Sequence, residues 1–225
     1  MPQEPVASSP LSVPEAFLLL CLRDEDGKAM LDGSTLGYGL GGAILSELAL
    51  AGAITIQDRK VVPTPGYGVD GSGAYKPFMQ LIAAARRPYK TEHWVTKFAS
   101  RSPKQLVGDL LAARNIVARA EGRILWVFPT VKYPEVDPVP EQQLRERIAN
   151  VLSGLRPDGF SASVIALADA TKILEKRFGP VPKERVTEIT DGDWASKAVK
   201  DAISAAITAA TTATTMTAVS SAGSN

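Results

Sequence analysis

The pattern of apolar and polar positions predicts a mainly α-helical chain with small β-hairpins between its helices. Residues 40–51 place apolar side chains at helical spacing, and Gly52 ends that helix. Two β-branched runs follow on either side of a polar turn at residues 57–60, which predicts a β-hairpin. A first helix is expected after Ser12, which can form a capping box with Glu15. Further helical patterns lie at residues 34–51, 76–87, 91–99, 103–114, 140–154 and 161–177.

The same order of a helix and then a hairpin returns at residues 110–128. Ile116 and Val117 precede a predicted turn near residues 121–122, and a continuous apolar run follows the turn. That run includes two aromatic side chains and consists of Ile124, Leu125, Trp126, Val127 and Phe128. We therefore predict a second hairpin over residues 116–128.

Two structural interpretations of the second hairpin remain open. If it is exposed, its apolar strand forms a docking edge for a bilayer or for a second copy of the chain. Lys132 and Tyr133 follow directly, and these residue types suit the boundary between water and lipid. If it is buried, the same run is a core strand, because apolar runs of this length are usual there.

Length and composition favour a single compact domain. The chain has 225 residues with 45% hydrophobic content, which is sufficient for one substantial core. We expect residues 1–10 to be disordered and residues 11–204 to form the helical domain. Residues 205–225 are rich in Ala, Thr and Ser, so we expect a frayed or disordered tail.

The overall charge gives the chain no field that would gather anions. Lys and Arg total 25 against 24 Asp and Glu, so the net charge is +1 and any anion site must be a local patch. Neither a signal peptide nor a transmembrane span is indicated. Cys21, the only cysteine, lies in an apolar run, which predicts a core side chain. We expect a cytoplasmic protein whose contact with a membrane, if any, is peripheral.

The residues that usually carry catalysis are sparse. His93 is the only histidine and Cys21 the only thiol, so the sequence shows neither metal-site spacing nor a Cys/His nucleophile pair. The glycines at residues 37–42 complete neither a dinucleotide-binding nor a Walker motif, and close helix packing is the favoured interpretation. We therefore expect no enzyme activity, no metal and no cofactor.

Nucleic-acid binding is also disfavoured. The helix-hairpin order of residues 34–62 resembles a winged helix, whose recognition helix needs basic side chains. Residues 34–52 contain no Lys or Arg, and Arg59 and Lys60 alone provide little charge for a phosphate backbone.

Basic residues instead gather around the middle of the chain. They flank Trp94, and together they could line one electropositive face. Arg can bind two phosphate oxygens and Lys adds a point charge, while Ser102 directly precedes a predicted helix N-terminus. A phosphorylated head group would suit such a face, and the alternative is an ordinary solvated helix surface. The residues are Arg86, Arg87, Lys90, Lys97, Arg101 and Lys104.

Several of these segments resemble the Golgi phosphoprotein 3 family, a group of membrane-peripheral proteins. The most specific block is residues 45–52, and Trp94 and the hairpin at residues 116–128 agree with it, as do residues 17–28 and 164–170. The resemblance implies a mainly helical single domain that acts as an adaptor. In eukaryotic members a Trp and three Arg bind phosphatidylinositol 4-phosphate, and a protruding hydrophobic hairpin aids membrane contact and self-association.

Position by position, the resemblance assigns Arg101 and Lys104 to two of the three phosphate-binding arginines. The third arginine falls on Gly41, and the Trp falls near Asp32. The expected ligand is an anionic phospholipid, either phosphatidylinositol 4-phosphate or another, and the chain is a candidate homo-oligomer. A self-association module without lipid binding is the alternative function, and an uncharacterised enzyme is less favoured.

Overall fold

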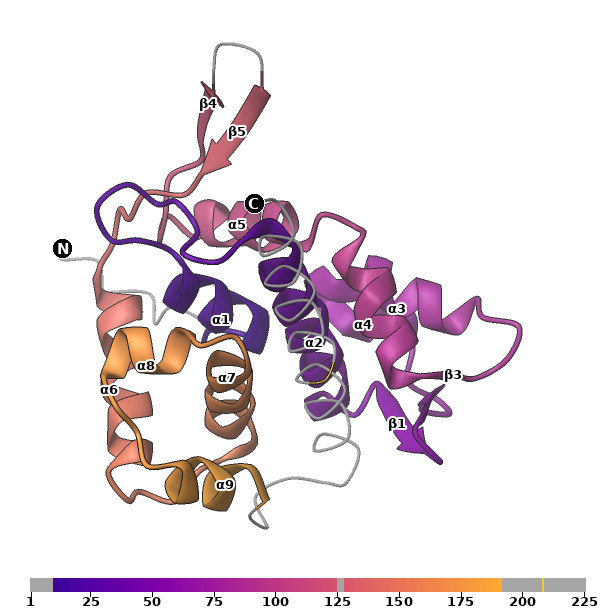
Figure 1. Cartoon of the computed structure of the whole chain (residues 1–225). Coiled ribbons are helices and arrows are strands. Elements are labelled where there is room, and N and C mark those ends of the chain that lie inside the picture. Colours follow the sequence, from indigo (N-terminus) through magenta and orange to yellow (C-terminus); the bar gives the residue numbers. More distant parts are fainter. Residues whose placement is uncertain (1–9, 125–127, 192–207, 209–225) are drawn as a thin grey trace, which may run out of the picture.

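The computed structural model describes residues 10–124, 128–191 and 208, and it confirms the mainly α fold class (Figure 1). Two small antiparallel sheets accompany the helices. The helices are α1 (Val13–Cys21), α2 (Gly33–Leu50), α3 (Lys76–Ala83), α4 (Thr91–Ala99), α5 (Pro103–Ala113), α6 (Val139–Leu152), α7 (Gly159–Ala170), α8 (Ile173–Phe178) and α9 (Lys183–Asp191), with a 3₁₀ segment η1 (Val69–Tyr75). The strands are β1 (Ile54–Gln57), β2 (Lys60–Pro63), β3 (Tyr89–Lys90), β4 (Ala120–Ile124) and β5 (Phe128–Lys132).

Helix α1 forms the centre of the core. Every residue from Val13 to Cys21 is buried, and the helix packs against α2, α5 and α7. A helix that is apolar on all sides is stable only when neighbours surround it. Its start is fixed by the predicted capping box, in which the Ser12 backbone N–H donates to Glu15 Oε2 at 2.9 Å. Burial raises the pKa of the Cys21 thiol far above its ordinary value.

Helix α2 depends on two glycines for its close contacts. A Cβ atom on Gly39 would lie 2.5 Å from the Phe17 ring, and one on Gly41 would lie 2.5 Å from the Val95 carbonyl oxygen. These positions allow α2 to approach α1 and α4 closely, which confirms the interpretation of this glycine-rich stretch as a packing feature.

The first predicted hairpin is confirmed. Strands β1 and β2 pair from Ile54↔Pro63 to Gln57↔Lys60, and β3 adds to β2. Asp58 and Arg59 both have positive φ, as a tight two-residue hairpin turn requires. Arg59 also contacts the Glu92 carboxylate at 2.6 Å, which ties the turn to α4.

The second hairpin lies further along the chain than predicted. Strands β4 and β5 pair from Ala120↔Lys132 to Ile124↔Phe128, so residues 121–122 lie within a strand and not at the turn. In Figure 1 the two strands extend away from the helical body. The predicted hairpin residues Leu125, Trp126 and Val127 lie outside the described part of the chain.

Ile116 and Val117 belong to the core and not to the hairpin. They are 3% and 2% exposed. The Ile116 backbone N–H donates to Leu111 at 3.0 Å, and Val117 forms an isolated bridge with Glu135. Their apolar side chains therefore pack in the core. The predicted hairpin boundary of 116–128 was wrong, because the paired strands run from Ala120 to Lys132.

The predicted helix at 161–177 is two helices. Lys172 adopts a left-handed φ of 62° between α7 and α8, and this conformation interrupts helical hydrogen bonding. Helix α9 was not predicted from the sequence. Of the expected disordered ends, only Pro10 and Thr208 are described. None of the described helices has both the length and the apolar character needed to cross a bilayer.

Candidate anion-binding site

A pocket of about 460 Å³ lies where the turn after α1, the start of α5 and the β4–β5 hairpin meet. Three lysines from these three segments line it, and none of its described lining residues is acidic. The lining consists of Lys28, Ala29, Lys104, Gly122, Thr130, Val131 and Lys132. We name this site the lysine pocket.

Lys104 joins α5 to the hairpin. Its Nζ donates a hydrogen bond to the Val131 carbonyl oxygen at 3.1 Å and lies 5.9 Å from the centre of the Tyr133 ring. An ammonium group has three donors, so this bond fixes its direction and leaves further N–H groups for an anion. Desolvation of the half-buried amine lowers the pKa of Lys104, and a bound anion would offset that desolvation.

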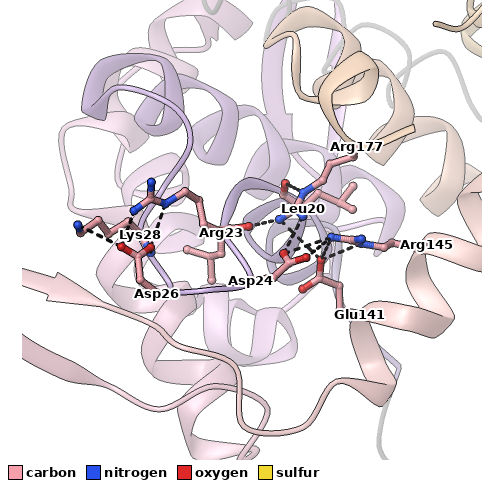
Figure 2. Close-up of polar contacts among 9 residues, drawn as sticks. Leu20, Arg23, Asp24, Asp26, Lys28, Glu141, Arg145 and Arg177 are labelled. Atoms are coloured by element: carbon pink, nitrogen blue, oxygen red, sulfur yellow. Dashed lines mark hydrogen bonds and ion pairs between the residues drawn. The ribbon is translucent and has the colours of Figure 1, made fainter. Parts of the chain in front are cut away.

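Lys28 is placed by the turn that follows α1. The Asp26 carboxylate accepts from the Lys28 backbone N–H at 3.1 Å and contacts Lys28 Nζ at 3.1 Å. Arg23 Nε donates to the same carboxylate at 2.9 Å, as Figure 2 shows. This hydrogen bond lowers the pKa of Asp26 well below its usual range. Asp26 therefore partly neutralises Lys28, whereas Lys104 and Lys132 form no ion pair with any described residue.

Tyr133 fastens the base of the hairpin. Its backbone N–H donates to the Gly27 carbonyl at 3.0 Å, and its hydroxyl donates to Asp109 Oδ1 at 3.2 Å. Desolvation and the Asp109 charge raise the pKa of Tyr133 to about 12, so the hydroxyl keeps its proton at neutral pH. These contacts hold Lys132, the preceding residue, at the base of β5.

Two glycines make room for that attachment. Gly27 has a φ of 65°, and a Cβ atom there would lie 2.1 Å from Pro134 N. A Cβ atom on Gly108 would lie 2.2 Å from the Tyr133 ring. The lysine pocket therefore requires close backbone approach on both sides of Tyr133.

A cluster of paired charges anchors the other side of the same turn (Figure 2). Arg177 contacts Asp24 at 2.7 Å, and its Nε donates to the Leu20 carbonyl at 2.9 Å. Arg145 bridges Asp24 at 3.1 Å and Glu141 at 2.8 Å. We name these four charged residues the Arg177 cluster, which links the turn after α1 to α6 and α8.

The structure places the two predicted phosphate-binding residues in different pockets. Lys104 lines the lysine pocket, whereas Arg101 is exposed in the α4–α5 turn and lines a second pocket with residues of α3. The members of the predicted basic stretch form no ion pair within the described part of the chain, so no carboxylate there balances their charge. They are Arg86, Arg87, Lys90, Lys97, Arg101 and Lys104.

Aromatic side chains of β3 and α4 order part of that basic stretch. Arg87 lies 5.2 Å from the Tyr89 ring centre, and Lys97 lies 5.4 Å from the Trp94 ring centre. His93 stacks on Tyr89 with 4.4 Å between ring centres. Desolvation and the charge of Lys97 lower the pKa of His93, which favours the neutral imidazole. Trp94 is 1% exposed and is a core residue.

The two altered positions of the resemblance both serve the fold. Asp32 caps α2, because its carboxylate accepts from the backbone N–H groups of Ser34 at 2.9 Å and Thr35 at 3.0 Å. Desolvation opposes ionisation of Asp32, but these hydrogen bonds outweigh it and lower the pKa. Gly41 is buried against Val95, so an arginine at this position would displace α4. Neither position lines the lysine pocket.

Lys28 and Lys132 were not predicted from the sequence as partners of Lys104. They are separated from it by 76 and 28 positions, and long-range contacts such as those of Tyr133 with Gly27 and Asp109 bring the three segments together. Lys132 was interpreted as a membrane-boundary residue, and Lys28 only as part of a family-like block. Within the described residues, no three His, Cys, Asp or Glu side chains gather where a metal ion could bind.

The described residues form a helical domain that carries an extended hairpin and has a basic pocket at the base of that hairpin. The model of the Golgi phosphoprotein 3 family (GPP34) matches residues 13–206, which is most of the chain. The chain therefore belongs to the Golgi phosphoprotein 3 family, and the resemblance described above is confirmed. No curated protein matches it.

Proposed function

We propose that this protein is a peripheral membrane adaptor that binds the anionic head group of a phospholipid in the lysine pocket. The observation that carries the proposal is the convergence of Lys28, Lys104 and Lys132 from three segments on a pocket whose described lining has no acidic residue. Lysine ammonium groups bind phosphate oxygens as point charges. Family membership is consistent with such a ligand.

The position of the hairpin supports the same proposal. Its strands leave the helical body beside the lysine pocket, so a surface that meets the pocket would also meet the hairpin (Figure 1). Thr130 adds a hydroxyl to the lining for a second kind of contact with the head group. We propose phosphatidylinositol 4-phosphate as the specific ligand to test first. The proposed role is binding and involves no chemical step.

Co-sedimentation with vesicles tests the proposal. The vesicles contain phosphatidylcholine alone, phosphatidylcholine with phosphatidylglycerol, or phosphatidylcholine with phosphatidylinositol 4-phosphate at matched total charge. We expect the wild type to bind both anionic vesicles. Each lysine near an anionic surface contributes about 1 kcal/mol, so the triple variant Lys28→Ala/Lys104→Ala/Lys132→Ala should bind more than about tenfold more weakly.

A matched triple variant controls for net charge. Lys60, Lys176 and Lys183 are exposed lysines in β2, α8 and α9, and replacing them with Ala removes the same charge. This control should bind nearly as well as the wild type. Equal loss in both triple variants would reduce the site to general electrostatic attraction. Absence of wild-type binding to every vesicle would reject the proposal.

Self-association without lipid is the second candidate function. β4 and β5 form a two-stranded sheet, so each strand has an edge through which a second copy could pair. Sedimentation velocity over a range of concentrations measures this directly. A concentration-dependent dimer in a protein that binds no vesicle would favour this function over lipid binding.

A further inference from the structure

A second pocket, of about 530 Å³, lies between α3 and α5. We propose that it binds a linear aliphatic carboxylate, with the hydrocarbon chain against α3 and the carboxylate on Arg101. Its apolar lining includes Pro77, Phe78, Leu81 and Leu106, and its polar lining consists of Gln80 and Arg101. This combination of an apolar wall with few polar groups is typical of small-molecule pockets, whose volumes are roughly 300–1,000 Å³.

The apolar wall has a buried floor and half-buried sides. Phe78 is 3% exposed and packs edge-on against Phe98, with 4.9 Å between ring centres, so the floor is held by the core. Leu81 and Leu106 are intermediate in exposure and leave apolar surface open to water. Covering that surface with a hydrocarbon chain is favourable, because the free energy of burial grows with the apolar area removed from water.

Arg101 supplies the charge that selects an anion. It is the only charged residue among the described lining residues, and it forms no ion pair within the described residues. A guanidinium can hold both oxygens of a carboxylate through two parallel N–H groups. The Gln80 side chain adds an uncharged amide at the same pocket. A ligand with an apolar body and one anionic end therefore matches the pocket in shape and charge.

The secondary structure of the lining favours a hydrocarbon over a peptide. Gln80 and Leu81 lie within α3 and Leu106 within α5, where backbone groups bond along the helix. A peptide would bring amide groups that find few partners there, and unpaired buried amides are costly. A hydrocarbon chain needs no hydrogen bonds beyond its carboxylate.

This inference does not depend on the proposed head-group site. Lys104 lies in the lysine pocket, whereas Arg101 and Leu106 face the pocket of α3. The two sites flank the start of α5 and share no lining residue. Each can therefore be removed without altering the other.

Calorimetric titration of the full chain with dodecanoate, below the concentration at which it forms micelles, tests the inference. We expect saturable binding with one site per chain, and no saturation with acetate, which lacks the hydrocarbon chain. The variant Arg101→Gln should bind about tenfold more weakly, because it loses a charge-assisted hydrogen bond. Arg86→Gln is the matched control, since Arg86 is exposed, has no described ion pair and lies outside the pocket.

Two further variants separate pocket binding from loss of fold. Gln80→Glu places a carboxylate on an exposed lining position and should abolish dodecanoate binding without disturbing the core. Leu81→Trp should fill the space beside the apolar wall with its larger side chain, and it should also abolish dodecanoate binding. Unchanged thermal unfolding of Gln80→Glu establishes that the domain is intact.

Three results would overturn the inference. The first is absence of saturable dodecanoate binding by the wild type, and the second is equal weakening by Arg101→Gln and Arg86→Gln. The third is tighter binding of acetyl-trileucine with a free carboxylate than of dodecanoate, which would assign the pocket to peptide C-termini. Dodecanoate binding should survive in the triple lysine variant, so failure at one pocket is distinguishable from failure at the other.

Discussion

Two groups of charged side chains adjoin the turn after α1, and they differ in how their charge is balanced. In the Arg177 cluster, Asp24 and Glu141 lie opposite Arg145 and Arg177, so the charges neutralise one another (Figure 2). In the lysine pocket, Asp26 is the only carboxylate in contact with a lining lysine within the described residues. The paired charges hold the turn, whereas Lys104 and Lys132 form no ion pair with a described residue, so their charge is not balanced within the described part of the chain.

Burial explains why the Arg177 cluster needs all of its partners. The Arg177 and Glu141 side chains are each 9% exposed. Desolvation raises the pKa of Glu141 even though Arg145 and Arg177 favour its charged form. Arg177 is further satisfied by the Leu20 and Leu22 carbonyl oxygens. Removal of one member of a buried ion pair is strongly destabilising, because it leaves the other charge buried without a partner.

The largest expected effect is therefore on stability, from Arg177→Met. This change leaves Asp24 and Glu141 without their most buried partner, and loss of one member of such a pair costs about 3–5 kcal/mol. We expect urea-induced unfolding to lose that free energy. Lys176→Met, at an exposed neighbouring position, should have almost no effect. An unchanged unfolding midpoint for Arg177→Met would contradict the structural role of the cluster.

A smaller loss is expected from Gly108→Ala, which crowds the attachment of the hairpin. The added methyl group would meet the Tyr133 ring, and overpacking of this kind costs about 1–3 kcal/mol. Vesicle binding should fall as well, because Tyr133 adjoins Lys132. Gly33→Ala is the control, since no neighbour lies within 4 Å of its Cβ position. Wild-type stability and binding of Gly108→Ala would show that the attachment tolerates the extra atom.

The smallest expected effect is a dependence of vesicle binding on pH, which arises in the lysine pocket and not in the Arg177 cluster. The pKa of Lys104 is lowered by desolvation, so Lys104 loses its proton before an exposed lysine as the pH rises. We expect binding to anionic vesicles to weaken as the pH rises and before exposed lysines, whose ordinary pKa is about 10.4, lose their protons; the loss is up to about fivefold for this one charge. Lys104→Arg should show a shallower decline, because its guanidinium stays charged. Parallel pH profiles would mean that Lys104 does not contact the lipid.

The sequence predicted the helices better than the contacts among their polar side chains. Helical spacing in residues 40–51 and the Ser12 capping box are local signals, and both appear in the structure. The break at Lys172 was missed because a lysine with left-handed φ has no compositional signal. The second hairpin was shifted because the apolar Ile116 and Val117 resembled a strand, although the core uses them.

The candidate site was predicted only in part, for a related reason. Lys104 was identified because it lies in a basic stretch and matches a family position. Lys28 and Lys132 could not be grouped with it, since their proximity depends on Gly27 and Tyr133, whose contacts bridge more than 100 positions. Long-range backbone contacts of this kind leave no periodicity in a sequence.

The burial of Cys21 makes the molecule convenient for site-directed labelling. Its thiol is the only one in the chain, it is fully covered within α1, and its raised pKa keeps it protonated and unreactive toward maleimides. A single cysteine introduced at the exposed Glu121 would therefore be the only reactive thiol. A fluorophore on strand β4 would then report whether the hairpin enters a bilayer, without removal of the native cysteine.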